Sequence, residues 1–408
     1  MSAMNSSQDN LIVALDIGSA WTRMLVVEQI DRALRYCGHG VAASAGMRKG
    51  MIAELGPAVK AVEAATKQAE FSSGINIGEC AVGVGGPHIH GLNTNGGIEL
   101  GSRMREIDNE DVQSAFLRAQ AVAWPADRKV LHLLRREFIL DDQPGIFDPV
   151  GMIGRKLEVD LHISTCSGSA LQSTVTCANR AGLEVTETVL ESIAAAEATL
   201  TADERELGVC LIDIGCHSTD LIVIVEGAVV HSASIRIGGQ HFTNDLAIGL
   251  DVSIAQAEEL KQSYGHSVVT EVPQDEEIEL ASRILRRRTL AEILEPRARE
   301  LLYYVKESLR EGGVEREGAV ERALGAGCVL TGGGALLPGM NYNAESLLRV
   351  PARTGVPVRI SHLPSELVHP GFSTAIGMIL YAQRTRANRP VESNTFSSKL
   401  RAVFAGSF

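Results

Sequence analysis

Residues 11–27, LIVALDIGSAWTRMLVV, and residues 209–225, VCLIDIGCHSTDLIVIV, carry the same short pattern twice in one chain. Each copy has an apolar stretch, an Asp-Ile-Gly turn with small polar residues, and a second apolar stretch. Mixed Leu, Ile and Val predict strands that are buried on both faces, and a turn glycine lets the backbone approach a ligand closely. The repeat therefore predicts an α/β protein with two related hairpins that hold a ligand between two lobes.

The turns of the two hairpins are suited to a triphosphate and its metal ion. Successive N–H groups in a tight turn form an anion-binding nest. A carboxylate at the end of a strand suits a Mg²⁺ ion that keeps most of its own waters. The residues expected to bind nucleotide here are Asp16, Gly18, Ser19, Asp213, Gly215 and Ser218, with Asp16 and Asp213 as ligands of Mg²⁺.

Length and composition limit the class of protein. A chain of 408 residues is long for one hydrophobic core, since single cores stop growing near about 250 to 300 residues, so two lobes are expected. No run approaches the roughly 18 apolar residues of a membrane-spanning helix, and no secretory signal is visible. The seven cysteines form no C-x-x-C pair and indicate neither a zinc site nor a disulfide framework, which favours a reducing cytosol. The net charge of −12 argues against nucleic acid as a partner.

Periodicity and turn residues predict the elements around the hairpins. Helices are expected over 55–71, 108–123, 190–200, 245–262 and 371–383, with another that ends at Gly182. A long helical region is expected over 283–311, interrupted at Pro296, after a polar loop near 265–280. Strands are expected near 79–86, 130–140, 156–164 and 328–331. The helix over 190–200 should connect the two lobes.

The duplicated hairpin is the signature of the actin, Hsp70 and sugar kinase superfamily, which this chain resembles along most of its length. Within that superfamily, the chain resembles the bacterial cell-division FtsA family. The resemblance is carried by ADERELGVCLIDIG at 202–215, RRTLAEILEPRARELL at 287–302, VLTGGGALLPGM at 329–340 and a short C-terminal helix. It implies an actin-like ATPase fold, in which two lobes contain duplicated RNase H-like cores and a family-specific subdomain 1C replaces the 1B subdomain of actin.

The resemblance also implies how the chain is divided and what it does. Subdomain 1A would cover 1–86 and 161–207, subdomain 1C 87–160, subdomain 2A 208–244 and 301–382, and subdomain 2B 245–300, followed by a linker over 383–395 and a membrane-targeting helix over 396–408. The implied protein binds ATP with at most slow hydrolysis and polymerises on the inner face of the cytoplasmic membrane at the division site. There it would anchor FtsZ filaments and help to recruit later division proteins.

Further site residues follow from the resemblance. Thr331, Gly332, Gly333 and Gly334 match the adenosine loop, and Lys306 and Glu307 lie on a helix that aligns with the element lining adenine and ribose. Glu191 stands where relatives carry a polar side chain that orients the attacking water or a metal-bound water. Arg23 stands where actin-like relatives direct a Lys toward the phosphates. The alternatives are a tight turn for the glycines, a carboxylate favoured by the helix dipole for Glu191, and solvent-exposed charges for the others.

The second hairpin departs from the superfamily pattern. Many relatives have a run of glycines and a Thr where this chain has Cys216, His217 and Ser218 after Gly215. Side chains at positions that usually hold glycine are expected to crowd the nest for the γ-phosphate, so binding would survive while hydrolysis suffers. A catalytic or metal-binding Cys-His pair is disfavoured, because neighbouring residues on a turn rarely converge on one atom.

The tail has a charge and a pattern of its own. Residues 383–408 contain five basic residues and one Glu, a charge of +4, which leaves −16 on the rest of the chain. Apolar residues at i, i+4, i+7 and i+8 predict one apolar helix face with cations beside it, which is typical of a helix lying in an anionic membrane surface. The residues concerned are Phe396, Lys399, Leu400, Arg401, Val403 and Phe404. The alternative is a helix that docks on the body of the protein.

A basic cluster is the candidate site for the FtsZ C-terminal peptide, which the resemblance assigns to subdomain 2B. Its members are Arg283, Arg286, Arg287 and Arg288, expected on one helix. A basic groove suits a short acidic and hydrophobic peptide. A solvated helix face or a contact for self-association fits the same pattern.

Two other functions use the same nucleotide clamp. A small-molecule kinase would need a catalytic Asp beside an acceptor pocket, and the one candidate is Asp220, which could equally orient a metal. A pilus-assembly relative would bind ATP and the peptide of an inner-membrane protein instead of lipid. The basic amphipathic tail has no use in a kinase.

Overall fold

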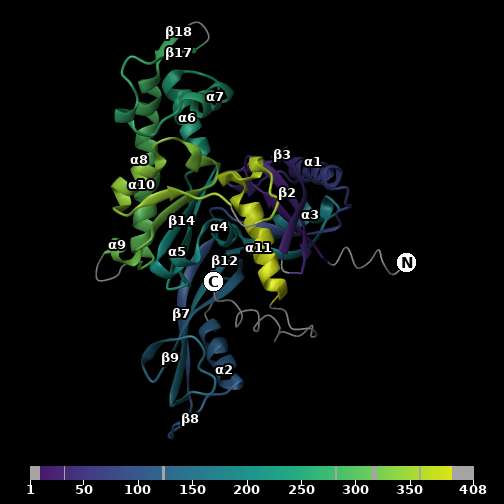
Figure 1. The fold of residues 1–408 in the computed structure, drawn as a ribbon, viewed down its shortest axis with the longest axis vertical. Helices are drawn as coiled ribbons and strands as arrows, with labels where there is room; N and C mark the ends of the chain where they lie inside the picture. The colour runs from purple at the N-terminus through teal and green to yellow at the C-terminus, as the bar shows by residue number, and fades with distance from the viewer. Residues whose placement is uncertain are drawn as a thin grey trace.

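Two five-stranded sheets with the same topology form the centre of the computed structural model, which describes residues 10–387 except 32, 122–124, 281–282, 315–318 and 358–359 (Figure 1). In each sheet an antiparallel hairpin is extended by one more antiparallel strand on one side and two parallel strands on the other. The first sheet contains β3 (Ala33–Ala43), β2 (Trp21–Ile30), β1 (Leu11–Ile17), β6 (Glu79–Val84) and β13 (Glu184–Leu190) in that order. The second contains β16 (Ala228–Ile235), β15 (Thr219–Val225), β14 (Val209–Ile214), β19 (Gly327–Thr331) and β20 (Ala352–Thr354). The predicted duplication of an actin-like core is confirmed.

Helices cover both faces of each sheet, which is why the hairpin strands are apolar without alternation. In the first lobe, one face of β1 packs on α1 (Leu55–Ser73) and α3 (Gly168–Arg180), and the other packs on α4 (Glu191–Thr199) and α11 (Ser373–Ala387). In the second lobe, one face of β14 packs on α6 (Gly239–Leu250), α8 (Arg287–Glu311) and α10 (Met340–Leu348), and the other packs on α4. The helix α4 thus connects the lobes, as its sequence predicts, and α5 (Ala202–Leu207) follows it.

Close packing of α4 against α11 depends on small residues. Every residue of α4 after Glu191 is buried, and its alanine-rich sequence lets neighbouring backbones approach closely. A Cβ atom placed on Gly377 of α11 would lie 1.6 Å from the carbonyl oxygen of Ala194. This helix crossing therefore tolerates no side chain at position 377.

Between β6 and α3 the chain forms a separate subdomain at one end of the molecule (Figure 1). Its sheet has the order β10 (Gln143–Ile146), β9 (Arg128–Leu140), β12 (Lys156–Ser167) and β7 (His90–Glu99), and it is covered by α2 (Asn109–Gln120). Asp108 caps α2 by accepting a hydrogen bond from the Asp111 N–H. Two short strands, β8 (Arg105–Glu106) and β11 (Ile153–Gly154), pair at its far end.

A buried polar joint attaches this subdomain to the second lobe. The side chain of His162 is hydrogen-bonded through Nε2 to the Ser232 hydroxyl of β16 at 2.8 Å and through Nδ1 to Asn93 at 2.7 Å. Asn93 also donates to the carbonyl oxygen of Val230 at 2.9 Å. Because His162 is fully buried, desolvation lowers its pKa to about 3, with further lowering by the nearby His231 and Arg136. The histidine is therefore neutral at physiological pH.

The second lobe carries an outer part built from helices and a hairpin. It contains α6, α7 (Ile254–Tyr264), the short 3₁₀ helix η1 (Val269–Glu271), β17 (Glu277–Leu280), β18 (Arg283–Arg286) and the start of α8. The expected single helix over 245–262 is wrong: Asp251 adopts a left-handed backbone with φ +50° and ends α6, and the Ser253 side chain caps α7. Residue 245 lies within α6 and residue 300 within α8, so both expected limits of subdomain 2B fall inside helices.

Two expectations about the segment 283–311 are also wrong. Residues 283–286 are a strand that pairs with β17, not the beginning of a helix. The helix α8 then runs without interruption through Pro296. Proline costs about 3 kcal/mol in a helix interior, but the apolar face of α8 packs along its whole length into the lobe, which offsets that cost. The buried residues of this face are Leu290, Ala291, Leu294, Ala298, Leu301, Leu302, Val305 and Leu309.

The remaining short elements are β4 (Met47–Arg48), β5 (Met51–Ile52), α9 (Val320–Ala323), η2 (Gly333–Leu336), η3 (Ser365–Leu367) and η4 (Pro370–Phe372). Across the part of the chain that the structure describes, no helix is long and apolar enough to cross a membrane.

Replacing Gly377 with alanine should destabilise the chain by at least about 2 kcal/mol, because the new methyl group would overlap the Ala194 carbonyl and push α11 away from α4. The matched control is Gly56→Ala in α1, where an added Cβ meets nothing within 4 Å. Helix propensity makes the control neutral or slightly stabilising. Urea unfolding of both variants measures the difference, and equal midpoints would contradict the packing described.

Acidification should weaken the joint at His162. The unfolded chain takes up a proton below about pH 6.5 while the folded chain keeps this histidine neutral down to about pH 3, so the unfolding free energy falls as the pH decreases across that interval. One such group contributes a slope of up to about 1.4 kcal/mol per pH unit. His132 and His231, whose burial lowers their pKa values to about 4, add to the slope. His162→Gln should therefore make melting temperature less dependent on pH than in the wild type between pH 6.5 and 4, and an unchanged dependence would contradict this.

Candidate functional site

A cavity of about 1550 Å³ lies between the lobes and is lined by the turns of both hairpins. Parallel strands end on the same edge of each sheet, so the turns after β1, β6, β14 and β19 meet at this cavity. Of the residues predicted to bind nucleotide or to act in catalysis, the cavity is lined by Asp16, Gly18, Ser19, Arg23, Glu191, Asp213, Gly215, Ser218, Asp220, Gly332, Gly333 and Gly334. Thr331 ends β19 directly before the glycines and is fully buried, where it accepts or donates a hydrogen bond with Ser373 at 2.7 Å.

Four carboxylates face the base of the cavity. Asp16 lies 3.2 Å from the Arg23 guanidinium, and Asp213 accepts a hydrogen bond from the Thr374 hydroxyl at 3.1 Å. Asp220 accepts from the Gly86 N–H at 3.3 Å. Glu191 begins α4 and lies against the backbone of the β6 turn, where a Cβ on residue 85 would come within 2.0 Å of its Oε2.

Burial and mutual repulsion shift the titration of these carboxylates. Burial raises the pKa of Asp213 to about 7, with a further contribution from Asp220 and Asp16. Burial likewise raises the pKa of Glu191 well above its usual range, and the other three carboxylates add to the effect. The pKa values of Asp16 and Asp220 are raised for the same primary reason. Such a cluster holds its charge at low cost only when a cation neutralises it.

The donor set fits a Mg²⁺ ion held mainly by a ligand and water. Mg²⁺ binds through one or two carboxylates plus phosphates and keeps several waters. Within the described ranges, no group of three or more His, Cys, Asp or Glu side chains is arranged to hold an ion alone. Asp16 and Asp213 could each supply one oxygen, in agreement with that limited protein contribution.

The glycine loop after β19 approaches the second hairpin so closely that only glycine fits. Gly332 has φ +79°, and a Cβ there would lie 2.2 Å from Asp213 Oδ1 and 2.6 Å from the Ile214 carbonyl oxygen. A Cβ on Gly333 would meet no atom within 4 Å. The loop is thus held against the carboxylate of Asp213, and the Gly332 N–H donates to the Pro370 carbonyl oxygen at 3.2 Å.

The wall of the cavity on α7 was not predicted from the sequence. Glu258, Lys261 and Gln262 line the cavity, and Lys261 Nζ donates to Glu258 at 2.7 Å and to the Thr243 hydroxyl at 2.8 Å. Side chains three residues apart share one helix face, so the Glu-x-x-Lys spacing after the cap at Ser253 was the available signal. This acid and amine could bind hydroxyl groups of a ligand.

Lys306 and Glu307, which were expected at the adenine and ribose, lie outside the residues that line the cavity. Lys306 Nζ donates to the Leu347 carbonyl oxygen at 3.3 Å, near the C-terminal end of α10, where a cation is favoured. Glu307 pairs with Arg310 one turn further along α8. Their helix packs behind the site and does not border it.

The unusual turn of the second hairpin presents one of its two large side chains to the site. Cys216 lines the cavity, whereas His217 is not among the lining residues. The carbonyl oxygens of Gly215 and Cys216 accept hydrogen bonds of 2.8 Å from the N–H groups of Gly239 and Gln240 at the start of α6. This fixes the turn against the second lobe.

The four arginines expected to bind a partner lie at the junction of β18 and α8. Arg283 and Arg286 belong to the strand, and Arg287 and Arg288 begin the helix. Arg287 makes a two-pronged contact with Glu276 at 3.0 Å, Arg288 pairs with Glu292, and Arg286 is exposed. Arg287 and Arg288 are thus paired with carboxylates, and Arg286 is an exposed cation beside them. The expected membrane-contacting residues Phe396, Lys399, Leu400, Arg401, Val403 and Phe404 lie outside the described residues.

The duplicated core and interlobe cavity define an actin-like ATPase fold, and comparisons with solved structures agree. A chain of the PilM-PilN type IV pilus biogenesis complex matches with a TM-score of 0.64 at 16% identity, covering 91% of this chain and 98% of that one. MreB5 of Spiroplasma citri bound to ADP matches with a TM-score of 0.54 at 14% identity, over 93% and 99% of the two chains.

Sequence comparison identifies the family. Residues 210–377 match the model for cell division protein FtsA, and residues 86–165 match the SHS2 domain inserted in FtsA. Cell division protein FtsA of Pseudomonas aeruginosa is 37% identical over 95% of this chain and 94% of its own length, and that of Escherichia coli is 33% identical over 95% and 94%. The chain therefore belongs to the FtsA family of cell division proteins.

Asp213→Asn is expected to stabilise the chain without ligand by about 1 to 2 kcal/mol at pH 8. The raised pKa of Asp213 means that the folded state prefers the neutral form, so stability declines as pH rises from the unfolded value of 3.8 through about 7. The amide mimics the neutral form and removes that decline. Thermal unfolding at pH 8 measures the effect.

The control is Asp245→Asn, because Asp245 accepts two hydrogen bonds from Arg297 at 2.6 and 3.0 Å and its loss should destabilise. Destabilisation by both substitutions would contradict a repulsive carboxylate cluster in the cavity.

Proposed function

We propose that the chain binds ATP with Mg²⁺ in the interlobe cavity, polymerises on the inner face of the cytoplasmic membrane, and anchors FtsZ filaments there at the division site. It would also help to recruit later division proteins. The observation that carries the nucleotide part is the meeting of two Asp-Ile-Gly turns and a glycine loop around four buried carboxylates. Solved MreB5 chains with the same fold are bound to ADP and to AMPPNP, which supports the same ligand class here.

Each group in the cavity would have a separate task. Backbone N–H groups of the turns that contain Gly18, Gly215 and Gly332 would donate to phosphate oxygens. The N–H groups of Gly215 and Gly332 themselves donate to the carbonyl oxygens of Ser218 and Pro370, so the donors would come from neighbouring turn residues. Asp16 and Asp213 would hold Mg²⁺, which when bound neutralises the charge of the phosphates. Arg23, now paired with Asp16 at 3.2 Å, is close enough to exchange that carboxylate for a phosphate oxygen.

Turnover would be slow at most. Glu191 is the candidate to orient an attacking water, with Asp220 as the second carboxylate on that side of the cavity. Burial keeps the pKa of Glu191 well above its usual range, so a bound cation would favour the charged form that accepts a proton from the water. Cys216 occupies space in the nest where many relatives have glycine, so the γ-phosphate would be held less closely than hydrolysis requires.

Membrane attachment is assigned to the basic amphipathic tail at 396–408. Burial of its four large apolar side chains favours binding. Ordering the tail on the surface costs conformational entropy that opposes this gain, so a single tail is a marginal anchor. A polymer presents many tails to one surface, and the effective concentration converts weak anchors into firm attachment.

The partner site for the FtsZ C-terminal peptide is placed at the junction of β18 and α8. The exposed Arg286 and the partly exposed Arg288 lie beside Ile284, whose exposure is 67%. Cations next to an exposed apolar side chain fit a short acidic peptide with apolar anchors. The acidic net charge of the rest of the chain would direct such a peptide to these few basic residues.

The two alternatives are less well supported. The 33–37% identity over nearly the whole chain is to cell division proteins, whereas the pilus complex shares only the fold at 16% identity. A kinase would transfer phosphate to a small acceptor and release the phosphorylated product. An assay for that product therefore tests this alternative directly.

Co-sedimentation with vesicles that contain phosphatidylglycerol tests the proposal. The full chain should pellet with vesicles more strongly with Mg-ATP than without, because nucleotide-dependent polymers present many tails together. A chain ending at Asn394 should stay in the supernatant under both conditions. Gly332→Ala, which places a methyl group against Asp213, should keep the weak ATP-independent pelleting and lose the enhancement.

Equal pelleting of all three proteins with and without ATP would refute the polymerising membrane tether. In that case, phosphorylation of a small substrate would favour the kinase, and peptide binding without lipid binding would favour the pilus-type adaptor.

A further inference from the structure

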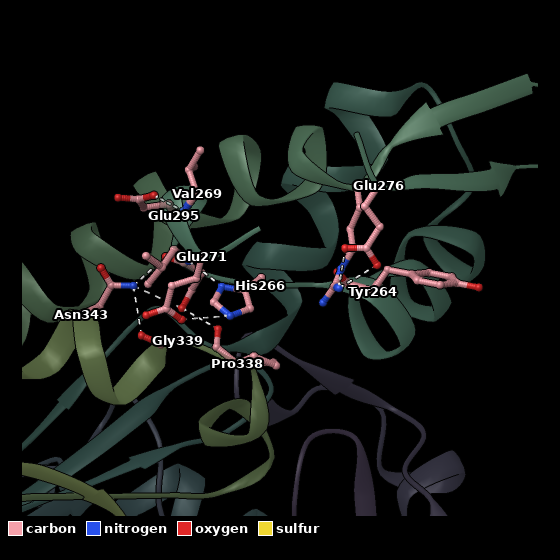
Figure 2. Close-up of polar contacts among 12 residues, drawn as sticks. Tyr264, His266, Val269, Glu271, Glu276, Glu295, Pro338, Gly339 and Asn343 are labelled. Atoms are coloured by element: carbon pink, nitrogen blue, oxygen red, sulfur yellow. Dashed lines mark hydrogen bonds and ion pairs between the residues drawn. The ribbon is translucent and has the colours of Figure 1, made fainter. Parts of the chain in front are cut away.

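The segment between α7 and β17, residues 265–276, connects the nucleotide cavity to the candidate partner site. A polar loop was expected near 265–280, but the structure buries Ser267, Val268 and Val272 almost completely. The segment also contains η1 and contacts the loop at Pro338 and the helices α8 and α10 (Figure 2). We refer to residues 265–276 as the latch segment.

At its start, the latch segment is fastened to the loop that follows the nucleotide glycines. The Ser267 N–H and hydroxyl both donate to the Pro338 carbonyl oxygen, at 2.8 and 2.9 Å. Asn343 of α10 donates through Nδ2 to the Ser267 carbonyl oxygen at 2.6 Å and to the Gly339 carbonyl oxygen at 3.3 Å. Figure 2 shows Asn343, Gly339 and Pro338 gathered on one side of the segment.

The contact around Ser267 is closely packed, so a movement of the segment would change its hydrogen bonds. Gly339 has φ +88°, and a Cβ there would lie 2.8 Å from the Ser267 hydroxyl. Asn343 is 1% exposed, and no partner for its Oδ1 is found within the described ranges. A buried acceptor left unpaired is costly, so this contact is one that a small displacement could improve or break.

Both walls held by the latch segment belong to the nucleotide cavity. Pro338 and its neighbours Leu336 and Leu337 line the cavity on one side, and Lys261 and Gln262 line it from the end of α7. The latch segment begins directly after α7, where the Gly265 N–H donates to the Lys261 carbonyl oxygen at 3.0 Å. A ligand that draws these two walls together therefore acts on both partners of the Ser267 contact. One partner is the loop at Pro338, and the other is the latch segment that starts at the end of α7.

At the other end, a single arginine closes the latch segment against the partner site. Arg287 donates from Nε to the Tyr264 carbonyl oxygen at 2.9 Å and from Nη1 to both carboxylate oxygens of Glu276 at 3.0 Å. Tyr264 and Glu276, which lie together in Figure 2, are the residues just before and at the end of the segment. Arg287 stands between Arg286 and Arg288, the cations proposed to receive the peptide.

From this arrangement we propose that the latch segment couples the two sites, so that nucleotide in the cavity strengthens binding of an acidic peptide at the junction of β18 and α8. The inference rests on the proposed function, because it deepens the roles assigned there to both sites. Nucleotide that orders the two cavity walls also orders the segment between them. The peptide then loses less conformational entropy of the protein when it binds. Because coupling between binding sites is reciprocal, the peptide must strengthen nucleotide binding by the same factor.

The test measures both affinities in the full chain, each alone and in the presence of the other ligand. The probes are Mg-ATP and a synthetic peptide with the C-terminal sequence of an FtsZ protein. In the wild type, saturating ATP should tighten peptide binding at least about fivefold, and the peptide should tighten ATP binding equally. Ser267→Ala and Asn343→Ala should bind each probe alone within about twofold of the wild type, while the coupling factor falls toward 1.

Ser72→Ala is the matched control. Its hydroxyl also bonds backbone groups, accepting from the His39 N–H at 2.9 Å and donating to the carbonyl oxygens of His39 at 2.8 Å and Ala69 at 3.1 Å, far from both sites in sequence. It should keep the wild-type coupling. The milder Ser267→Ala serves as the test if the buried Asn343→Ala does not fold.

A wild-type coupling factor of 1, or a factor that persists in Ser267→Ala, would overturn the inference while leaving both binding sites intact. Failure of the wild type to bind ATP or the peptide alone would instead overturn the proposed function, and the inference with it. The two failures are therefore distinguishable in the same set of titrations.

Discussion

The arrangement of the interlobe cavity is centred on four buried carboxylates where the two hairpins meet. Asp16, Asp213, Asp220 and Glu191 come from three strand ends and a helix start, and burial raises the pKa of each. No folding benefit explains such a cluster, since like charges in a poorly solvated space destabilise the native state. The chain retains this destabilising group of charges at the place where a bound cation would neutralise it. Carboxylates with strongly shifted pKa values are typical of functional sites.

The duplicated sheets explain how so much charge can be held between rigid walls. Each hairpin strand is apolar on both faces and is packed on both sides, so the turn at its end cannot retreat from the cavity. The helix α4 lies between the lobes and starts with Glu191, and its close crossing with α11 at Gly377 fixes its position on the first lobe. Packing of small residues thereby sets the geometry of the polar site.

Much of this organisation was predictable because the determining signals are local. The repeated hairpin predicted the duplicated core and six residues of the cavity lining, and the family resemblance added Arg23, Glu191 and the three glycines 332–334. The errors arose where tertiary packing overrides local preference. Pro296 signalled a break, but a long buried apolar face keeps α8 continuous. The arginine-rich stretch was expected to be helical, although its first four residues pair with β17, which lies just before it in the sequence. Lys261 of α7 was missed because residues 245–262 were expected to form one helix. The chain instead ends α6 at Asp251 and starts α7 at Ile254, which changes the direction in which the side chains of α7 point.

The helix α11 contacts both the carboxylate cluster and α4, the helix that connects the lobes. Thr374, in its first turn, donates to Asp213 at 3.1 Å, and Arg384, near its last turn, lies 3.0 Å from Glu197 of α4. Fifteen residues of helix span about 22 Å, and a helix packed along that length moves as one body. Neutralising Asp213 would change its hydrogen bond to Thr374, and the displacement would reach α4 through the tight contact at Gly377. A change of charge in the cavity therefore acts on α11, which packs on α4, the helix that connects the two lobes.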